Sequence, residues 1–207
     1  MISAVVLAGG DSARFGGDKA FADIEGKPMI RHIIDRVRAC ADEFVVAAGT
    51  AAQRDELAEI VPEALFAVDR MPGRGPLLGL ASALDVTNGE LAAVLTCDVP
   101  LVSPKVVGFM LDLCRRSDAV VPRWPNGYAE PLHAAYKVRR TQLAAAKVIE
   151  TERFDMRSLL SELHVLYLST LVIKSIDPKL QSFFNVNTLG DLRAAQRLLK
   201  TGHSSQR

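Results

Sequence analysis

The sequence has few cysteines, few aromatic residues and almost no net charge. Its three cysteines, Cys40, Cys97 and Cys114, are spaced too widely for a CxxC pair and are an odd number for a disulfide framework. We therefore expect a reducing, cytoplasmic compartment. The formal net charge of +1 provides no overall field to attract nucleic acid or an anionic membrane. An anionic ligand must then be held by local geometry.

Long apolar runs are also missing. No uninterrupted run approaches the length of a membrane-spanning helix. The apolar N-terminus, from Met1 to Gly10, has neither the length nor the positive charge of a signal peptide. With 49% hydrophobic and 24% charged residues, the composition is that of a globular protein that buries a core without disulfides or metals. We expect neither a membrane nor a nucleic acid as a partner.

Short β-branched and aliphatic runs alternate with helical patterns through the first half of the chain. These runs are continuously apolar, as is typical of strands covered on both faces. The alternation predicts an α/β fold of three layers, αβα, with a Rossmann-like, mostly parallel sheet and helices on both faces. The expected strands are Ser3–Ala8, Glu43–Ala48, Ala64–Val68, Ala92–Thr96 and Ala119–Pro122.

Helical patterns and capping signals complete the expected organisation. Thr188 and Asp191 form a capping-box-like start for a last helix. No linker-like composition interrupts the chain, so we expect a single domain over residues 1–200 and a disordered tail over 201–207. The other expected helices are Met29–Ala41, Lys105–Cys114 after Ser103-Pro104, Arg139–Glu150 and Met156–Leu163, with a further strand over Ala129–Tyr136.

The most informative segment runs from Leu7 to Phe21, LAGGDSARFGGDKAF. An apolar strand leads into four glycines interleaved with Arg14 and Lys19. Glycines let backbone N–H groups approach phosphate oxygens, and the two cations supply compensating charge. The segment therefore predicts a phosphate-binding loop. The alternative is a plain βα loop with turn glycines, which the two cations make less favoured.

Two familiar phosphate-binding motifs do not fit this segment. A Walker A loop requires Gly-Lys followed by serine or threonine, whereas Lys19 lies between Asp18 and Ala20. A Rossmann fingerprint requires a second glycine two places after its first, and those places hold Asp11 and Ser12. The loop therefore belongs to neither class.

Asp98 follows the expected strand Ala92–Thr96, at the edge where open α/β sheets bind ligands. Mg²⁺ needs only one or two protein carboxylates when substrate phosphates and water complete its octahedron. Asp98 is therefore a candidate magnesium ligand, and the alternative is a turn aspartate before Val99-Pro100. Cys97 should point to the opposite face, into the core.

A third strand–loop–helix junction runs from Asp69 to Ser82. Asp69 has an acceptor suited to ribose or base, and the helix start at Pro76 can face phosphate or sugar. The alternative is a solvated loop punctuated by proline and glycine. Because three such junctions place polar residues on one edge of the expected sheet, their coincidence is stronger evidence than any one of them.

Two further features lie in the second half of the chain. Alternation places Asn185 and Asn187 on one face, where paired amides can orient phosphates or a metal-bound water. A strand end capped by Thr188 explains the same residues, and both explanations can hold. His133 is a candidate contact for a second substrate, although a lone histidine in a strand is more often structural.

Four segments together resemble the molybdenum cofactor guanylyltransferases (the MobA family). They are Leu7–Phe21, Gly75–Ser82, Cys97-Asp98-Val99-Pro100 and Asn185-Val186-Asn187-Thr188, and the likeness spans Ser3 to Leu199 in order. The Leu-Ala-Gly-Gly loop is shared by many sugar and lipid nucleotidyltransferases. The Gly-Pro-Leu-x-Gly and Asn-x-Asn-Thr motifs are more specific to the guanylyltransferases.

This resemblance implies a nucleotide-diphospho-sugar transferase type of fold and transfer of GMP from Mg-GTP to the phosphate of molybdopterin, releasing pyrophosphate. The N-terminal half would hold GTP and the C-terminal half the acceptor, with transient contacts to other cofactor-biosynthesis proteins or apo-molybdoenzymes. The implied catalytic residues are Lys19, Asp98 and Arg14, with Asp98 also the Mg²⁺ ligand. The implied nucleotide contacts are Leu7, Ala8, Gly9, Gly10, Lys19, Asp69 and Asp98, and the implied acceptor contacts are Gly79, His133, Asn185 and Asn187.

One position departs from the family pattern. Gly49 stands after the second expected strand, where the family has an asparagine, and this leaves the choice between guanine and cytosine open. A molybdopterin cytidylyltransferase, a phospholactate guanylyltransferase and a non-catalytic nucleotide-binding protein are the alternatives. Because Lys19 and Asp98 are both present, a non-catalytic protein is the least favoured.

Overall fold

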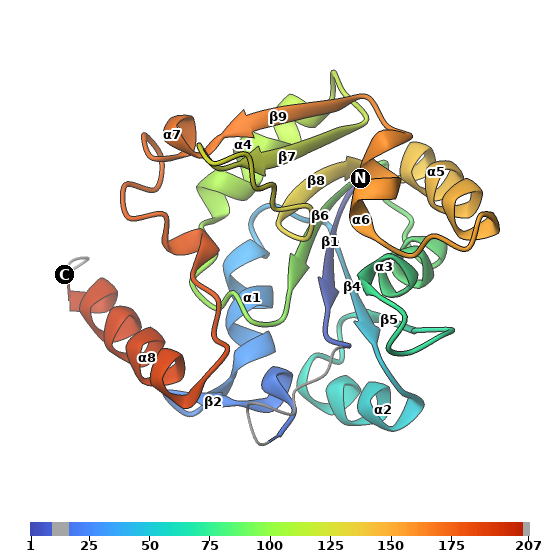
Figure 1. Cartoon of the computed structure of the whole chain (residues 1–207). Helices are drawn as coiled ribbons and strands as arrows, with labels where there is room; N and C mark the ends of the chain where they lie inside the picture. Colours follow the sequence, from blue (N-terminus) through green and yellow to red (C-terminus); the bar gives the residue numbers. More distant parts are fainter. Residues whose placement is uncertain (10–16, 205–207) are drawn as a thin grey trace.

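The computed structural model describes residues 1–9 and 17–204 (Figure 1), and the side chains of 201–204 are not described. A seven-stranded sheet forms the middle layer, in the order β5-β4-β1-β6-β8-β7-β9. Strand β8 is antiparallel to its neighbours β6 and β7, and the other pairs are parallel. The strands are β1 Ile2–Leu7, β4 Glu43–Ala48, β5 Leu65–Val68, β6 Leu91–Thr96, β7 Ala119–Arg123, β8 Ala134–Lys137 and β9 Val165–Ser169.

Helices cover both faces of this sheet because alternate strand residues point to opposite sides. Ala4 and Val6 of β1 belong to one hydrophobic cluster, with α1, α2 and α4, while Val5 and Leu7 belong to a second, with α3, α5 and α6. The predicted three-layer αβα fold is therefore confirmed. The helices are α1 Met29–Val37, α2 Ala51–Ile60, α3 Pro76–Asp85, α4 Pro104–Cys114, α5 Val138–Glu150 and α6 Met156–Ser161.

The register of the sheet aligns the carboxyl ends of its central strands. Leu7, the last residue of β1, is paired with Ala47 of β4 and with Thr96 of β6. The loops that leave these strands therefore start side by side at one edge. This edge is where ligands bind in open parallel α/β sheets.

The last helix, α8 (Leu189–Ser204), packs away from the sheet against a small third cluster. Ala195 and Leu199 of α8 meet Ile24 and Val186 there. The helix continues beyond Lys200 into the segment expected to be a disordered tail, where no proline interrupts it. Residues 205–207 lie outside the described residues.

Several elements differ from the sequence-based expectation. The strand expected over Ala129–Tyr136 begins only at Ala134, because residues 130–133 form a turn closed by the bond from His133 N to Glu130 O (3.1 Å). Helix α2 and strand β9 were not expected. Also unexpected are the hairpin β2 (Asp23–Ile24) and β3 (Lys27–Pro28), helix α7 (Thr170–Ile173) and the 3₁₀ turns η1 (Lys19–Phe21) and η2 (Gln181–Phe183).

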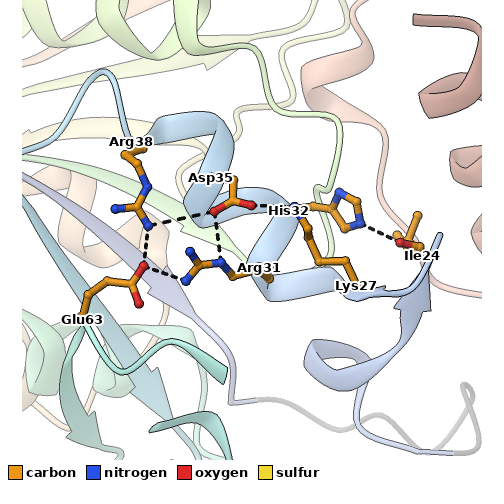
Figure 2. Close-up of polar contacts among 7 residues, drawn as sticks. All are labelled: Ile24, Lys27, Arg31, His32, Asp35, Arg38 and Glu63. Carbon is orange, nitrogen blue, oxygen red and sulfur yellow. Dashed lines mark hydrogen bonds and ion pairs between the residues drawn. The ribbon is translucent and has the colours of Figure 1, made fainter. Parts of the chain in front are cut away.

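The outward face of α1 carries a network of ion pairs, shown in Figure 2. Asp35 accepts from Lys27 at 2.7 Å and from Arg31 at 3.0 Å. Glu63, which follows α2, accepts from Arg31 at 2.6 Å and also from Arg38. The network links α1 to the segment before β5, and its partly exposed pairs contribute modestly to stability.

His32 on the same helix fastens the β2–β3 hairpin to α1. Its Nε2–H donates to the carbonyl oxygen of Ile24 at 2.8 Å, since a carbonyl can only accept. Burial lowers the pKa of His32, so the neutral ring is favoured. Among the described residues, no helix is both long and apolar enough to cross a membrane.

Candidate active site

A cavity of about 770 Å³ opens at the carboxyl ends of β1, β4, β5 and β6. This volume is within the usual range for small-molecule sites. Of the residues predicted from sequence to contact substrates, Leu7, Gly9, Asp69 and Gly79 line it directly. The other lining residues are Asp18, Ala47, Ala48, Gly49, Thr50, Gln53, Pro72, Gly73, Gly75, Pro76, Thr96 and Leu132. The three predicted strand–loop–helix junctions therefore do converge on one site.

Lys19 is the central charge beside this cavity. Its Nζ lies 2.6 Å from Asn187 Oδ1 and 3.6 Å from Asp98 Oδ2. The side chains of Lys19 and Asp98 are only 16% and 20% exposed, so their attraction is less screened than that of a surface pair. The other carboxylate oxygen of Asp98 accepts from Thr96 Oγ1 at 2.5 Å. Three predicted residues, far apart in the chain, thus form one cluster.

Asn187 is held in place by the start of α8. The carboxylate of Asp191 accepts from the backbone N–H groups of Asn187 (3.1 Å) and Thr188 (2.9 Å), while Thr188 Oγ1 accepts from Asp191 N (3.1 Å). The predicted capping box is therefore present. The bond from Val186 N to Asp98 O (2.8 Å) joins the segment to the β6 loop. Asn185 and Asn187 are exposed, and Val186 between them is buried.

Helix α3 begins at the rim of the cavity, on a glycine that no other residue can replace without strain. Gly75 has φ +117°, and a Cβ there would lie 2.8 Å from the carbonyl oxygen of Phe154. Pro76 follows as the first helical residue and has no N–H to satisfy. The N–H groups of Leu77 and Leu78 lack intrahelical acceptors, as in any first turn, and favour an anion.

Asp69 and Gly79 face each other across this rim. The carboxylate of Asp69 accepts from Met71 N at 2.9 Å, which shapes the loop after β5. A Cβ at Gly79 would lie 3.7 Å from Asp69 Oδ2, so any larger side chain would extend into the space beside this carboxylate. The Gly-Pro-Leu-x-Gly motif therefore determines where α3 begins and leaves open space beside the Asp69 carboxylate.

Gly9, at the start of the glycine-rich segment, makes a close backbone contact with Gly49. A Cβ at Gly9 would lie 3.0 Å from Gly49 N and 3.1 Å from Gly49 Cα, a contact so tight that the backbone at Gly49 would have to shift to admit a side chain. Gly49, the residue that departs from the family pattern, is thus in contact with the loop itself. Gly10 and Arg14 lie outside the described residues, so their expected roles stay predictions.

Gln53 and Asp18 are site residues that the sequence analysis missed. Gln53, in the first turn of α2, hydrogen-bonds to Ala8, Gly49 and Asp18. Asp18 accepts from Ala20 N at 2.9 Å and thereby caps η1, the turn that carries Lys19. A Thr50-x-x-Gln53 capping signature is the one local signal that could have drawn attention to Gln53.

His133 and Cys97 are in the core rather than at the cavity. His133 is 4% exposed and packs on Phe183, with ring centroids 4.7 Å apart. Its ring nitrogens have no hydrogen-bond partner among the described residues, and burial lowers its pKa to about 4. Its expected contact with the acceptor stays a prediction. Cys97 is buried, as expected, and desolvation raises its pKa, so it is a poor nucleophile.

The cluster around Asp98 fits a magnesium ion that is shared with a substrate. Within the described residues, no group of three or more His, Cys, Asp or Glu side chains is placed to hold a metal. A single carboxylate is sufficient when phosphate oxygens and water fill the remaining positions. Asp98 has such a carboxylate, partly exposed and beside the cavity that Thr96 lines.

Comparison with known proteins relates this arrangement to one family. The family model for the MobA-like NTP transferase domain matches residues 4–166. A molybdenum cofactor guanylyltransferase from Desulfosudis oleivorans is 32% identical over 99% of this chain and 98% of its own length. A probable molybdenum cofactor guanylyltransferase from Pyrococcus horikoshii is 37% identical over 91% of this chain and 96% of its own length.

Solved structures show the same relationship. The crystal structure of molybdopterin-guanine dinucleotide biosynthesis protein A from Archaeoglobus fulgidus superposes with a TM-score of 0.81 and 26% identity, covering 96% of this chain and 99% of that one. A nucleotidyl transferase from Methanothermobacter, 18% identical, has a TM-score of 0.70 and shows the shared fold alone.

Proposed function

Because the chain belongs to the MobA-like NTP transferase family, we propose that it transfers GMP from magnesium-bound GTP to the phosphate of molybdopterin and releases pyrophosphate. The family membership confirms the resemblance found in the sequence, and the chain is a nucleotidyltransferase. The guanylyltransferase activity is supported by the names of relatives that match over nearly its whole length.

The observation that carries the proposal is the Lys19–Asp98–Asn187 cluster beside the cavity. In the reaction, a phosphate oxygen of molybdopterin forms a bond to the α-phosphorus of GTP. The bond from that phosphorus to the oxygen bridging to the β-phosphate breaks, and its electron pair leaves with pyrophosphate. The attacking group is already an anion, so the reaction needs positioning and charge stabilisation rather than a nucleophilic side chain.

Each member of the cluster has a distinct task in this proposal. The Lys19 ammonium neutralises charge that develops on the leaving pyrophosphate, and the amide of Asn187 orients that ammonium. Asp98 would hold Mg²⁺, which would offset the negative charge of the substrate phosphates. Helix α3 begins at the cavity, which Gly75 and Pro76 line, and the N–H groups of a first helical turn favour an anionic or hydroxyl-bearing part of the substrates.

The two halves of the chain contribute unequally to the cavity. Apart from Leu132, its lining residues all come from residues 7–96, which supports placing the nucleotide on the N-terminal half. Asn187 reaches Lys19 from the far end of the sequence, so the acceptor is proposed to approach from the side of the C-terminal half. Asn185 is the predicted acceptor residue next to Asn187 in the chain, and its contact with the acceptor is part of the proposal. Gly79 lines the cavity beside Asp69, and its contact with the acceptor is proposed from there.

A pyrophosphate-release assay tests this function. The protein is incubated with Mg²⁺ and molybdopterin cofactor, and with GTP, CTP or ATP in separate reactions. We expect release that depends on the acceptor and is fastest with GTP. Release with CTP instead would assign a different nucleotide to the same site, and no release with any nucleotide would refute the proposal.

A further inference from the structure

Gln53 connects three segments of the active site through one side-chain amide. Its Oε1 accepts from Gly49 N at 2.6 Å, and its Nε2 donates to Ala8 O at 3.1 Å and to a carboxylate oxygen of Asp18. Ala8 directly follows β1, and Asp18 immediately precedes Lys19. These partners lie 45 and 35 residues away in sequence, so the contacts belong to the tertiary structure of the site.

The partners of Gln53 fix the orientation of its amide. Gly49 offers a donor, whereas Ala8 and Asp18 offer acceptors, and only the orientation with Oε1 towards Gly49 satisfies all three. In that orientation both Nε2 hydrogens are used. No donor of this amide remains to recognise a base, so Gln53 acts on the substrate through other residues.

The amide acts on Lys19 through a short chain of contacts. Gln53 holds one oxygen of the Asp18 carboxylate, and the other oxygen accepts from Ala20 N and caps η1. That turn begins with Lys19, whose Nζ reaches Asn187 and Asp98. A displaced Asp18 would release the turn and therefore the ammonium, at a site where a shift of about 1 Å is costly for catalysis.

We propose that Gln53 is a positioning residue that ties Ala8 to Asp18 and so fixes Lys19 for binding and transfer of the nucleotide. This inference rests on the proposed function of the site. Residues 10–16, between the two tied points, lie outside the described residues, and the inference concerns only the flanking contacts.

A simpler role for Gln53 is that of a helix cap. Thr50-x-x-Gln53 has the spacing of a capping box, and Gln53 N donates to Thr50 Oγ1 at 3.1 Å. Glutamate serves in a capping box as well as glutamine does. Gln53→Glu therefore keeps the acceptor towards Gly49, but it loses both donors and places a second carboxylate beside Asp18. A helix cap therefore predicts unchanged nucleotide affinity for Gln53→Glu, whereas a positioning role predicts a loss.

The test measures Mg-GTP binding by calorimetry without acceptor, and then kcat and KM for pyrophosphate release. For Gln53→Glu we expect nucleotide affinity to fall about tenfold or more, because the hydrogen bond to the Asp18 carboxylate is lost and a like charge is added beside it. The apolar variant Gln53→Met should lose affinity less than Gln53→Glu, since it adds no charge. Gln142→Glu is the matched control, because Gln142 donates its amide to Leu84 O at 2.7 Å on another helix.

A pH profile gives a readout that a helix cap would not produce. Two neighbouring carboxylates raise the pKa of one of them, so a lower pH favours a shared proton in the Gln53→Glu variant. A protonated carboxyl can donate again, and the activity of Gln53→Glu relative to the wild type should rise as the pH is lowered.

The outcomes separate this inference from the proposed function. If the wild type binds GTP and Gln53→Glu binds it equally well, with kcat unchanged, Gln53 is only a cap and the inference is overturned. Equal losses in Gln53→Glu and Gln142→Glu would overturn it too. A wild type that binds no nucleoside triphosphate would overturn the proposed function together with it. If Gln53→Glu does not fold, the comparison of Gln53→Met with the control decides.

Discussion

The buried imidazole of His133 should make the protein lose stability in mild acid. The ring is 4% exposed, its nitrogens have no partner among the described residues, and burial lowers its pKa from the ordinary value of 6.5 to about 4. As the pH falls below 6.5, His133 becomes protonated in the unfolded chain but stays neutral in the folded chain. Stability is therefore full above the unfolded pKa and decreases down to the folded pKa.

The size of this effect follows from the two pKa values. With 6.5 for the unfolded chain and about 4 for the folded one, linkage gives a loss of about 2 kcal/mol between about pH 7 and pH 5. His133→Leu removes the titrating group and two buried nitrogens without partners among the described residues. At pH 8 we expect the variant to be at least as stable as the wild type, because an unsatisfied buried polar group is itself costly.

Urea denaturation of both proteins at pH 8, 7, 6 and 5 measures the difference. The wild type should lose about 2 kcal/mol more than His133→Leu between pH 7 and pH 5. His32, whose pKa burial also lowers, contributes equally to both proteins and cancels. Parallel pH dependences of the two proteins would show that His133 is not held neutral. The same variant, assayed for its KM for molybdopterin, tests the predicted acceptor contact separately.

Three further substitutions test two residues of the site and the backbone turn that begins α3. Asp98→Asn should lower kcat/KM by about a hundredfold or more with little change in thermal midpoint, since the amide can still accept from Thr96; near-native turnover would remove Asp98 from the mechanism. Lys19→Ala should lower the transfer rate about a hundredfold, and unchanged GTP binding and turnover would leave the glycine-rich segment as a plain connection. Gly75→Ala should destabilise the fold by about 2 kcal/mol or more in urea, since φ is +117° and the new Cβ would lie 2.8 Å from Phe154 O. An unchanged unfolding midpoint for that variant would contradict the proposed strain.

The central strands were predictable because burial on both faces makes them continuously apolar. β1, β4 and β6 were found within a residue of their observed bounds. Helix α2 was missed because Leu57 is its one fully buried residue, so it shows no apolar stripe. Strand β9 was missed because it lies at the edge of the sheet and its residues are mostly partly exposed, with Leu168 the buried one.

The candidate site was predictable in part, for a related reason. Lys19, Asp98 and Asn187 stand in motifs at the ends of elements, where chemistry-bearing residues are conspicuous. Gln53 stands only in a helix-capping signature, which does not mark a binding site. Its partners in the site are two backbone groups and one carboxylate that only the folded chain brings together. His133, a candidate acceptor contact from sequence, is a buried side chain, and its contact with the acceptor stays a prediction.

If this chain transfers GMP to molybdopterin, it should show a nucleotide preference that can be measured with a defined acceptor. Initial rates with GTP and CTP, at saturating molybdopterin and Mg²⁺, give the two values of kcat/KM. A pocket that hydrogen-bonds a base rejects the wrong one because buried polar groups are left unpaired, so we expect GTP to be preferred by at least about tenfold. A preference for CTP, or equal rates with and without molybdopterin, would contradict the account.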